Sequence, residues 1–239
     1  MSTPEAEALP PSTPAGKMIQ TLVGIAMLSG FLVVLTYQLT KPIIAENQRR
    51  AIEAAVFTVI PDAVVRRDFV INDEGLTPVT GEESVKGVLI YAGYNRDGEL
   101  KGIAAKAAAQ GYADLIHLLY GYDPGCECIR GMKVLKLAET PGLGDKIITD
   151  ANFVANFEAL DARLSSDGST LANEIVTVKA GSKQNPWEID AISGATISSK
   201  AVGKAINQSA KQLLPSITPH LEKLKQPPVL PDQHEVADD

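Results

Sequence analysis

Residues 85–109 read VKGVLIYAGYNRDGELKGIAAKAAA, two mostly apolar runs on either side of the polar sequence NRDG at 95–98. A short polar connection that ends in glycine, placed between two such runs, is typical of a β-hairpin. A second pair of runs, at 116–122 and 128–138, flanks the turn sequence DPG at 123–125. The sequence therefore predicts two hairpins at the centre of the fold.

Helical patterns follow these hairpins. The pattern DANFVANFEALDARL at 150–164 predicts a helix, EIVTVK at 174–179 predicts a short strand, and a last helix is expected to begin near Thr196. The inner face of that last helix is expected to carry six apolar residues: Ile197, Ala201, Ala205, Ile206, Ala210 and Leu213. Together these elements predict an α+β domain at 61–215.

An uncharged run at 18–39 precedes the domain, and Lys17 and Lys41 bracket it. As a helix this run would reach about 33 Å, enough to cross the hydrocarbon core of a membrane. Tyr37 lies where an interfacial aromatic residue is expected. A cleaved secretory signal is the alternative, but the run is long for such a signal and no small-x-small cleavage site follows it. The sequence favours one uncleaved transmembrane helix at 17–40.

The remaining segments are simpler. Residues 1–16 are rich in proline, serine and threonine, which predicts a disordered tail. Residues 41–60 predict an amphipathic juxtamembrane helix that Pro61 stops, and 216–239 predict an acidic, proline-containing C-terminal tail.

Composition excludes several classes of function. The net charge is −7, whereas nucleic-acid binding needs clustered lysine and arginine. The three histidines are scattered, so the sequence shows neither the pattern of a hydrolytic triad nor that of a set of zinc ligands. The two cysteines lie in Cys126-Glu127-Cys128, where a disulfide would close a very small ring and is not expected. Two alternatives stay open for them: strand cysteines without a ligand role, or two ligands of a metal centre shared with a partner.

Residues 190–200 read DAISGATISSK, and their small residues precede the expected helix start at Thr196. Free backbone N–H groups and the helix dipole favour an anion at such a start. Small side chains would let the main chain approach a phosphate closely. An ordinary helix start with small residues for tight packing explains the same pattern, so the residues alone leave both interpretations open.

The segment DAISGAT at 190–196 is similar to the attachment motif of the FMN-binding domain family. In that family the final threonine carries FMN through a phosphoester that a flavin transferase installs. Two further matches are ETPGLGDK at 139–146 and Gly111-Tyr112 before the strand at 116–119. In this order, after one N-terminal anchor, they resemble the G subunit of Rnf-type electron transport complexes. The C subunit of sodium-pumping NADH:quinone reductases is the nearest relative of that protein.

The resemblance implies that Thr196 is the ester-bonded residue and that Ser193, Gly194 and Ala195 lie against the phosphate. Asp190 would be read by the transferase and would help to position the threonine hydroxyl.

The loop with Thr140, Gly142, Leu143 and Gly144 would border the flavin ring or the ribityl chain. A Pro-Gly turn after a strand is the structural alternative for this loop. Tyr112 would flank the ring, or it would be an ordinary packed tyrosine.

The implied function is that of a membrane-anchored flavoprotein subunit. It would carry covalent FMN as an electron relay in an ion-translocating ferredoxin:NAD oxidoreductase (Rnf-type) complex, without independent catalytic activity. Its partners would be the other subunits and the flavin transferase. The resemblance places the domain on the outer face of the bacterial cytoplasmic membrane, whereas Lys41, Arg49 and Arg50 against Lys17 favour the inner face. The alternatives are a flavin-containing redox sensor and a cofactor-free anchored binding module.

Overall fold

The computed structural model describes residues 15–72, 75–79 and 86–226. The chain forms two units, residues 1–49 and the remainder from Arg50. Helix α1 (Ala15–Val59) is continuous and contains Pro42, so the expected transmembrane and juxtamembrane segments belong to one helix. Most of the predicted N-terminal tail lies outside the described residues.

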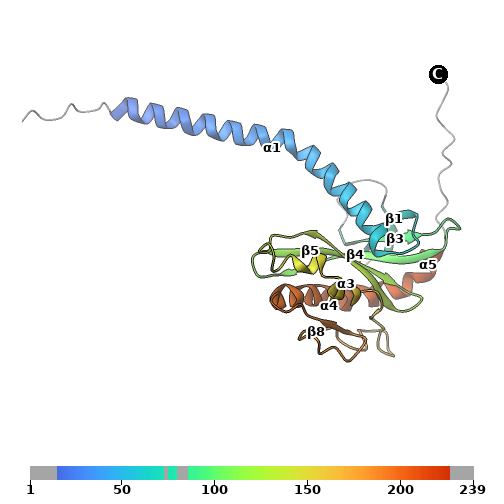
Figure 1. Cartoon of the computed structure of the whole chain (residues 1–239). Coiled ribbons are helices and arrows are strands. Elements are labelled where there is room, and N and C mark those ends of the chain that lie inside the picture. The colour runs from blue at the N-terminus through green and yellow to red at the C-terminus, as the bar shows by residue number, and fades with distance from the viewer. Residues whose placement is uncertain (1–14, 73–74, 80–85, 227–239) are drawn as a thin grey trace, which may run out of the picture. The chain divides into compact units, whose positions relative to one another are not determined.

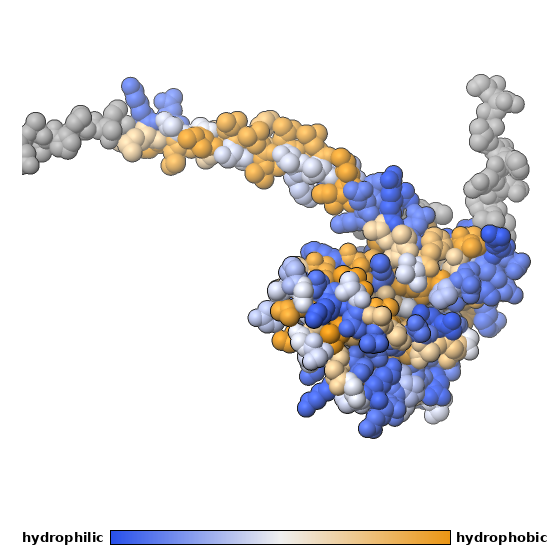
Figure 2. All heavy atoms as spheres, viewed as in Figure 1, coloured by the Kyte–Doolittle hydropathy of each residue, from blue (hydrophilic) through white to orange (hydrophobic). Residues whose placement is uncertain are grey.

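The first unit consists of the apolar part of α1. Its apolar side chains between residues 18 and 39 are exposed along the helix, as Figure 2 shows. Within the described residues, α1 alone is long and apolar enough to cross a membrane. A helix that is apolar on all sides and covered by no other element is typical of a membrane span.

The second unit is built on a seven-stranded antiparallel sheet. Its order is β2-β1-β3-β4-β5-β6-β7. The strands are β1 (Val65–Asn72), β2 (Gly75–Pro78), β3 (Val88–Tyr94), β4 (Leu100–Gln110), β5 (Leu115–Asp123), β6 (Cys128–Lys136) and β7 (Leu160–Asp161). Both predicted hairpins are confirmed as β3–β4 and β5–β6, and the α+β class is confirmed with them.

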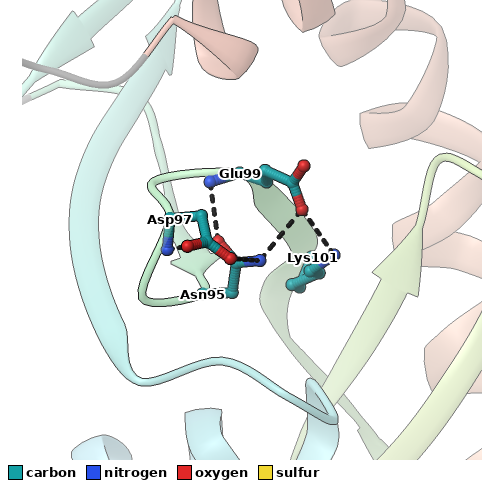
Figure 3. A network of polar contacts seen from close by, with 4 residues as sticks. All are labelled: Asn95, Asp97, Glu99 and Lys101. Atoms are coloured by element: carbon teal, nitrogen blue, oxygen red, sulfur yellow. Dashed lines mark hydrogen bonds and ion pairs between the residues drawn. The ribbon is translucent and has the colours of Figure 1, made fainter.

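The turn between β3 and β4 shows why the first hairpin forms (Figure 3). The side-chain oxygen of Asn95 accepts hydrogen bonds from the N–H groups of Asp97 and Glu99, at 3.0 and 2.8 Å. The Glu99 carboxylate in turn accepts from Asn95 and from Lys101, at 2.9 and 3.0 Å. Gly98 supplies the positive φ of 77° that closes the turn.

Helix α4 (Thr196–Ile217) covers one face of this sheet, against β4 and β5. Alternate residues of the two strands point toward it, among them Ile103, Ala105, Leu118 and Tyr120, because successive side chains of a strand face opposite sides. A small parallel sheet of β8 (Val176–Val178) and β9 (Glu188–Asp190) lies on the other side of α4 (Figure 1). The main core therefore surrounds α4.

The last turns of α1 cover the opposite face of the sheet. Ala55, Val56, Val59 and Ile60 form a second buried cluster with Tyr91 and its neighbours. Four glycines on adjacent strands form the seat for this helix end: Gly93, Gly102, Gly121 and Gly131. A Cβ at either of the last two would collide with the main chain of Val59, so only glycine allows the helix this close.

The predicted helix at 150–164 is wrong in extent. Helix α2 (Lys146–Thr149) and helix α3 (Ala151–Ala155) are both short, and the chain then turns into β7. The amide of Asn156 bonds the carbonyl oxygens that end α3, and β7 pairs with Cys128 and Ile129 at the edge of β6. Tertiary pairing therefore overrides the helical pattern.

The C-terminal tail was predicted to begin at residue 216, but regular structure continues to Lys225. Helix α4 is followed by the 3₁₀ turn η1 (Thr218–His220) and by α5 (Leu221–Lys225). Leu224 is fully buried, and its carbonyl accepts a hydrogen bond from the Tyr94 hydroxyl at 2.9 Å. Residues 227–239 lie outside the described part of the chain.

The cysteine pair also departs from expectation. Cys126 and Cys128 are joined by a disulfide in the turn between β5 and β6. Glu127 adopts a positive φ of 51°, which brings the two flanking Cα atoms to 5.2 Å, within the range that a disulfide spans. The prediction against a bond across one residue is therefore wrong, because the backbone of the middle residue removes the geometric obstacle.

Candidate functional site

The DAISGAT motif forms a tight turn that leads into α4. The N–H of Ala195 donates to the carbonyl of Ile192 at 3.0 Å, and Gly194 has a φ of +84°. A turn with positive φ at its third residue favours glycine there. The buried Ser199 hydroxyl accepts from the N–H of Ile192 and donates to the carbonyl of Ala195, at 3.1 and 2.9 Å. The turn is thereby fixed to the first turn of the helix.

Thr196 is the first residue of α4, as predicted, and its side chain is exposed. Ala195 is the N-cap residue, and no side chain caps the helix start by a hydrogen bond. Backbone N–H groups of the first turn are therefore available to an anion, and the helix dipole favours negative charge beside Thr196.

A cavity of about 550 Å³ opens beside Thr196. This volume lies within the range of about 300–1,000 Å³ that is usual for small-molecule sites. Its walls come from the turn after β4, the loop after β6 and the start of α4. The lining residues are Tyr112, Glu139, Thr140, Leu143, Gly144, Gly194, Ala195, Thr196, Ile197 and Ser198. The three separate sequence motifs thus meet at one place.

Three of the lining side chains are apolar and largely exposed. Tyr112 is 70% exposed, Leu143 51% and Ile197 54%. The sequence placed Ile197 on the inner face of the helix; that prediction is wrong, because the first turn of α4 borders the cavity rather than the sheet. Exposed apolar side chains gathered at a cavity indicate a binding surface.

Glu139 is a lining residue of the cavity that the sequence did not single out as a site residue. The residue is 7% exposed, and its carboxylate accepts hydrogen bonds from the Ser198 hydroxyl and, at 3.0 Å, from the N–H of Ala113. These contacts connect all three walls of the cavity. Glu139 opens the ETPGLG motif, and a charged residue within a matched motif was the available signal.

Burial alone would raise the pKa of Glu139. The hydrogen bonds from Ser198 and from the N–H groups of Tyr112, Ala113 and Asp114 outweigh this effect, so the pKa lies below its ordinary value. Glu139 therefore remains an anion in the wall of the cavity at neutral pH.

The glycines of the 140–144 loop serve different purposes. Gly142 has a φ of +78° and open space around it, and the carbonyl of Thr140 closes the turn by accepting from Leu143 and Gly144. Gly144 is buried, and a Cβ there would meet the side chains of Glu139 and Ser198. Thr140, Leu143 and Gly144 line the cavity, whereas Gly142 shapes the loop from outside the lining.

Asp190 and Ser193 lie apart from this cavity. Both line a second cavity of about 550 Å³ with Lys146 and Asp150. The Asp190 carboxylate accepts from the N–H groups of Gly181 and Ser182, at 2.8 and 3.2 Å. In the described part of the chain no hydrogen bond joins it to Thr196. The structure thus gives Asp190 a role in holding the 181–182 turn.

Comparisons with known proteins give a consistent result. Residues 111–211 match the model of the FMN-binding domain, and residues 20–59 match the RnfG N-terminal region. The G subunit of the ion-translocating oxidoreductase complex of Methanosarcina acetivorans is 32% identical over 81% of this chain and 91% of its own length.

Two further proteins are similar to this chain, one over a shorter part of it and the other at lower sequence identity. The G subunit of the Na(+)-translocating ferredoxin:NAD(+) oxidoreductase complex of Acetobacterium woodii is 36% identical over 50% of this chain and 52% of its own length. The crystal structure of the C subunit of the Na(+)-translocating NADH-quinone reductase from Parabacteroides distasonis is 23% identical over 66% of this chain and 76% of its own, with a TM-score of 0.48.

Proposed function

The chain belongs to the family of G subunits of ion-translocating oxidoreductase complexes, and from this premise we propose that it is a membrane-anchored electron carrier with FMN bound covalently to Thr196. The observation that carries the proposal is the exposed Thr196 at an uncapped helix start, on the wall of a cavity of suitable size.

The apolar rim of the cavity fits a flavin ring. Tyr112, Leu143 and Ile197 offer exposed apolar surface from three different segments. An isoalloxazine ring placed among them would cover surface that is otherwise exposed to water. Bound FMN supplies the electron-transfer chemistry, while the residues of this chain position it and exclude water.

The charges at the cavity favour an ester over a free phosphate. Among the described residues that line it there is no lysine or arginine, and Glu139 adds a negative charge. A free FMN phosphate would bring close to two negative charges at neutral pH. A phosphodiester to the Thr196 hydroxyl brings one, which the N–H groups of the first turn of α4 can accept.

The membrane role rests on α1 and on the relatives. We propose that α1 anchors the protein by one span in the cytoplasmic membrane, beside other subunits of an Rnf-type complex. Electrons would pass through the flavin in an ion-translocating ferredoxin:NAD oxidoreductase, and a flavin transferase would install FMN. We keep Asp190 as the expected recognition residue for that transferase.

The Cys126–Cys128 bond favours the outer face for the FMN-binding domain. Disulfides persist in oxidising compartments and are rare where thiols are kept reduced. This argument opposes the small excess of Lys41, Arg49 and Arg50 over Lys17. The charge rule is weak for a chain with one large translocated domain, so we propose the outer face.

The covalent bond is tested by expressing the full-length protein together with a flavin transferase. Wild type is expected to show flavin fluorescence in a denaturing gel and a flavin-nucleotide mass adduct on the peptide with Thr196. Thr196→Ala removes the accepting hydroxyl and should abolish both signals. Thr140→Ala, which changes another threonine of the same cavity, should retain both. Covalent flavin that persists in the Thr196→Ala protein would refute the site.

The orientation is tested separately, by protease treatment of intact cells whose outer envelope has been opened. Externally added protease is expected to degrade the FMN-binding domain and to leave a cytoplasmic marker protein intact. Protection of the domain until the inner membrane is broken would place it on the inner face, without affecting the assignment of Thr196.

A further inference from the structure

The disulfide turn between β5 and β6 lies far from the cavity. Tyr112 borders the cavity just before β5 begins, and the disulfide follows where β5 ends at Asp123. Eight steps along the strand correspond to about 26 Å. Whatever this bond does, it is separate from the place where the flavin is proposed to bind.

Contacts other than the disulfide also hold the turn. The Asp123 carboxylate accepts from the N–H of Gly125 at 2.7 Å, and Asp123 pairs with Cys128 in the β5–β6 ladder. On the other side, the N–H of Ala162 donates to the carbonyl of Glu127 at 3.0 Å. A bond that closes so short a loop also constrains the unfolded chain least, so it adds little as a structural cross-link.

The two sulfur atoms differ in access. Cys126 is exposed at the tip of the turn, whereas Cys128 is 6% exposed and pairs with Asp161 where β6 meets β7. An incoming thiolate can therefore reach the Cys126 sulfur, with the Cys128 sulfur as the leaving group. Exposed disulfides are the ones that exchange, in contrast to buried structural ones.

We propose that Cys126–Cys128 is a thiol–disulfide exchange site that accepts two electrons from a dithiol. One thiolate of the dithiol attacks the Cys126 Sγ, the S–S bond breaks, and its electron pair leaves on the Cys128 Sγ, which takes up a proton. The second thiolate of the dithiol then attacks the first sulfur of the same dithiol, which is bonded to the Cys126 Sγ in the mixed disulfide. Cys126 leaves and takes up a proton, and the dithiol has become a disulfide.

The charges around the turn indicate which thiol donors suit it. Asp123 and Glu127 flank the two cysteines, and Arg163, which lies close enough to Glu127 to sense its charge, is paired with Asp161 at 2.8 Å. An anionic thiol such as glutathione is repelled at close range, whereas a neutral dithiol is not. Exchange with glutathione should therefore accelerate with added salt, and exchange with dithiothreitol should not.

The test uses the full-length protein in detergent without denaturant. The protein is equilibrated with mixtures of reduced and oxidised glutathione, free thiols are trapped with a maleimide, and the intact mass is measured. We expect the fraction of reduced protein to follow the glutathione ratio reversibly. A bond that stays oxidised at every ratio until the protein is denatured, or cysteines that stay reduced at every ratio, would overturn the proposal.

Two variants separate exchange from a structural role. Cys128→Ser leaves the exposed Cys126, and it should form a mixed disulfide with oxidised glutathione at least tenfold faster than Cys126→Ser, which leaves the buried Cys128. The double variant with alanine at both positions should keep the melting temperature and the flavin content of the wild type. A clear fall in its melting temperature would identify the bond as a structural cross-link and refute the exchange site.

Discussion

Glycine serves opposite purposes in two regions of this molecule. In the seat beneath the end of α1, glycines such as Gly121 remove side chains so that the main chain of Val59 can touch the sheet. At the cavity, Gly142 and Gly194 have open space around them and are required by their positive φ. The seat is therefore a filled joint that fixes the fold, whereas the cavity rim is shaped by turns and leaves room for a ligand.

The largest expected effect comes from filling the seat. Gly121→Ala places a Cβ against the carbonyl of Val59, and neither side can move without shifting α1 or β5. We expect a loss of about 3 kcal/mol in the free energy of unfolding, since overpacking against backbone cannot relax by a rotamer change. Chemical denaturation of the full-length protein in detergent measures this loss.

Gly93→Ala is the matched control for the seat. Its added Cβ would meet the flexible end of the Ile60 side chain and the Cβ of Ala63, both at 2.9 Å, but no main-chain atom within that distance. Ile60 can change its rotamer, and Ala63 belongs to the loop after α1, so this contact should relax more easily than the one at Gly121. The expected loss is about 1 kcal/mol. Equal losses of stability for the two variants would contradict the expectation that a collision with main chain costs more than a collision with side-chain atoms.

A smaller effect is expected at the cavity wall, from Glu139→Gln. The amide cannot replace a carboxylate that accepts from both Ser198 and Ala113, so unfolding should become easier by about 2 kcal/mol at pH 7. Glu174→Gln, in an exposed ion pair with Lys211, should change stability little.

The pH dependence of the Glu139 effect has a definite sign. The folded-state pKa of Glu139 is lowered relative to about 4.3 in an unfolded chain. The ionised carboxylate therefore contributes stability above that pH, and the contribution is lost as the pH falls through the folded pKa. The difference in stability between wild type and Glu139→Gln should shrink in acid. A difference that grows in acid would contradict the lowered pKa.

Local patterns in the sequence predicted much of the fold. The turns at 95–98 and 123–125 and the apolar face of α4 depend on neighbours in the chain, and the structure confirms both hairpins and the helix start at Thr196. The three motifs of the cavity were also recognised, although only the fold brings them together. Local signals were thus sufficient where the contacts themselves are local.

The predictions failed where distant contacts decide. Leu160 and Asp161 read as part of a helix but pair with the edge of β6. The disulfide depends on the φ of Glu127, which the sequence does not reveal. Glu139 was passed over because its partners, Ala113 and Ser198, come from segments far apart in the chain.

The smallest effect on stability and the sharpest test of the cavity come from Ile197→Ser. Since Ile197 is 54% exposed, the free energy of unfolding should change by no more than about 0.5 kcal/mol. If the side chain covers a flavin ring, however, its loss should make the flavin fluorescence of the loaded protein easier to quench with iodide. Val154→Ser changes an exposed apolar residue on α3 outside the cavity, and should alter neither property. Equal quenching of the flavin in both variants and in the wild type would mean that the ring does not lie against the start of α4, even if its phosphate is bonded there.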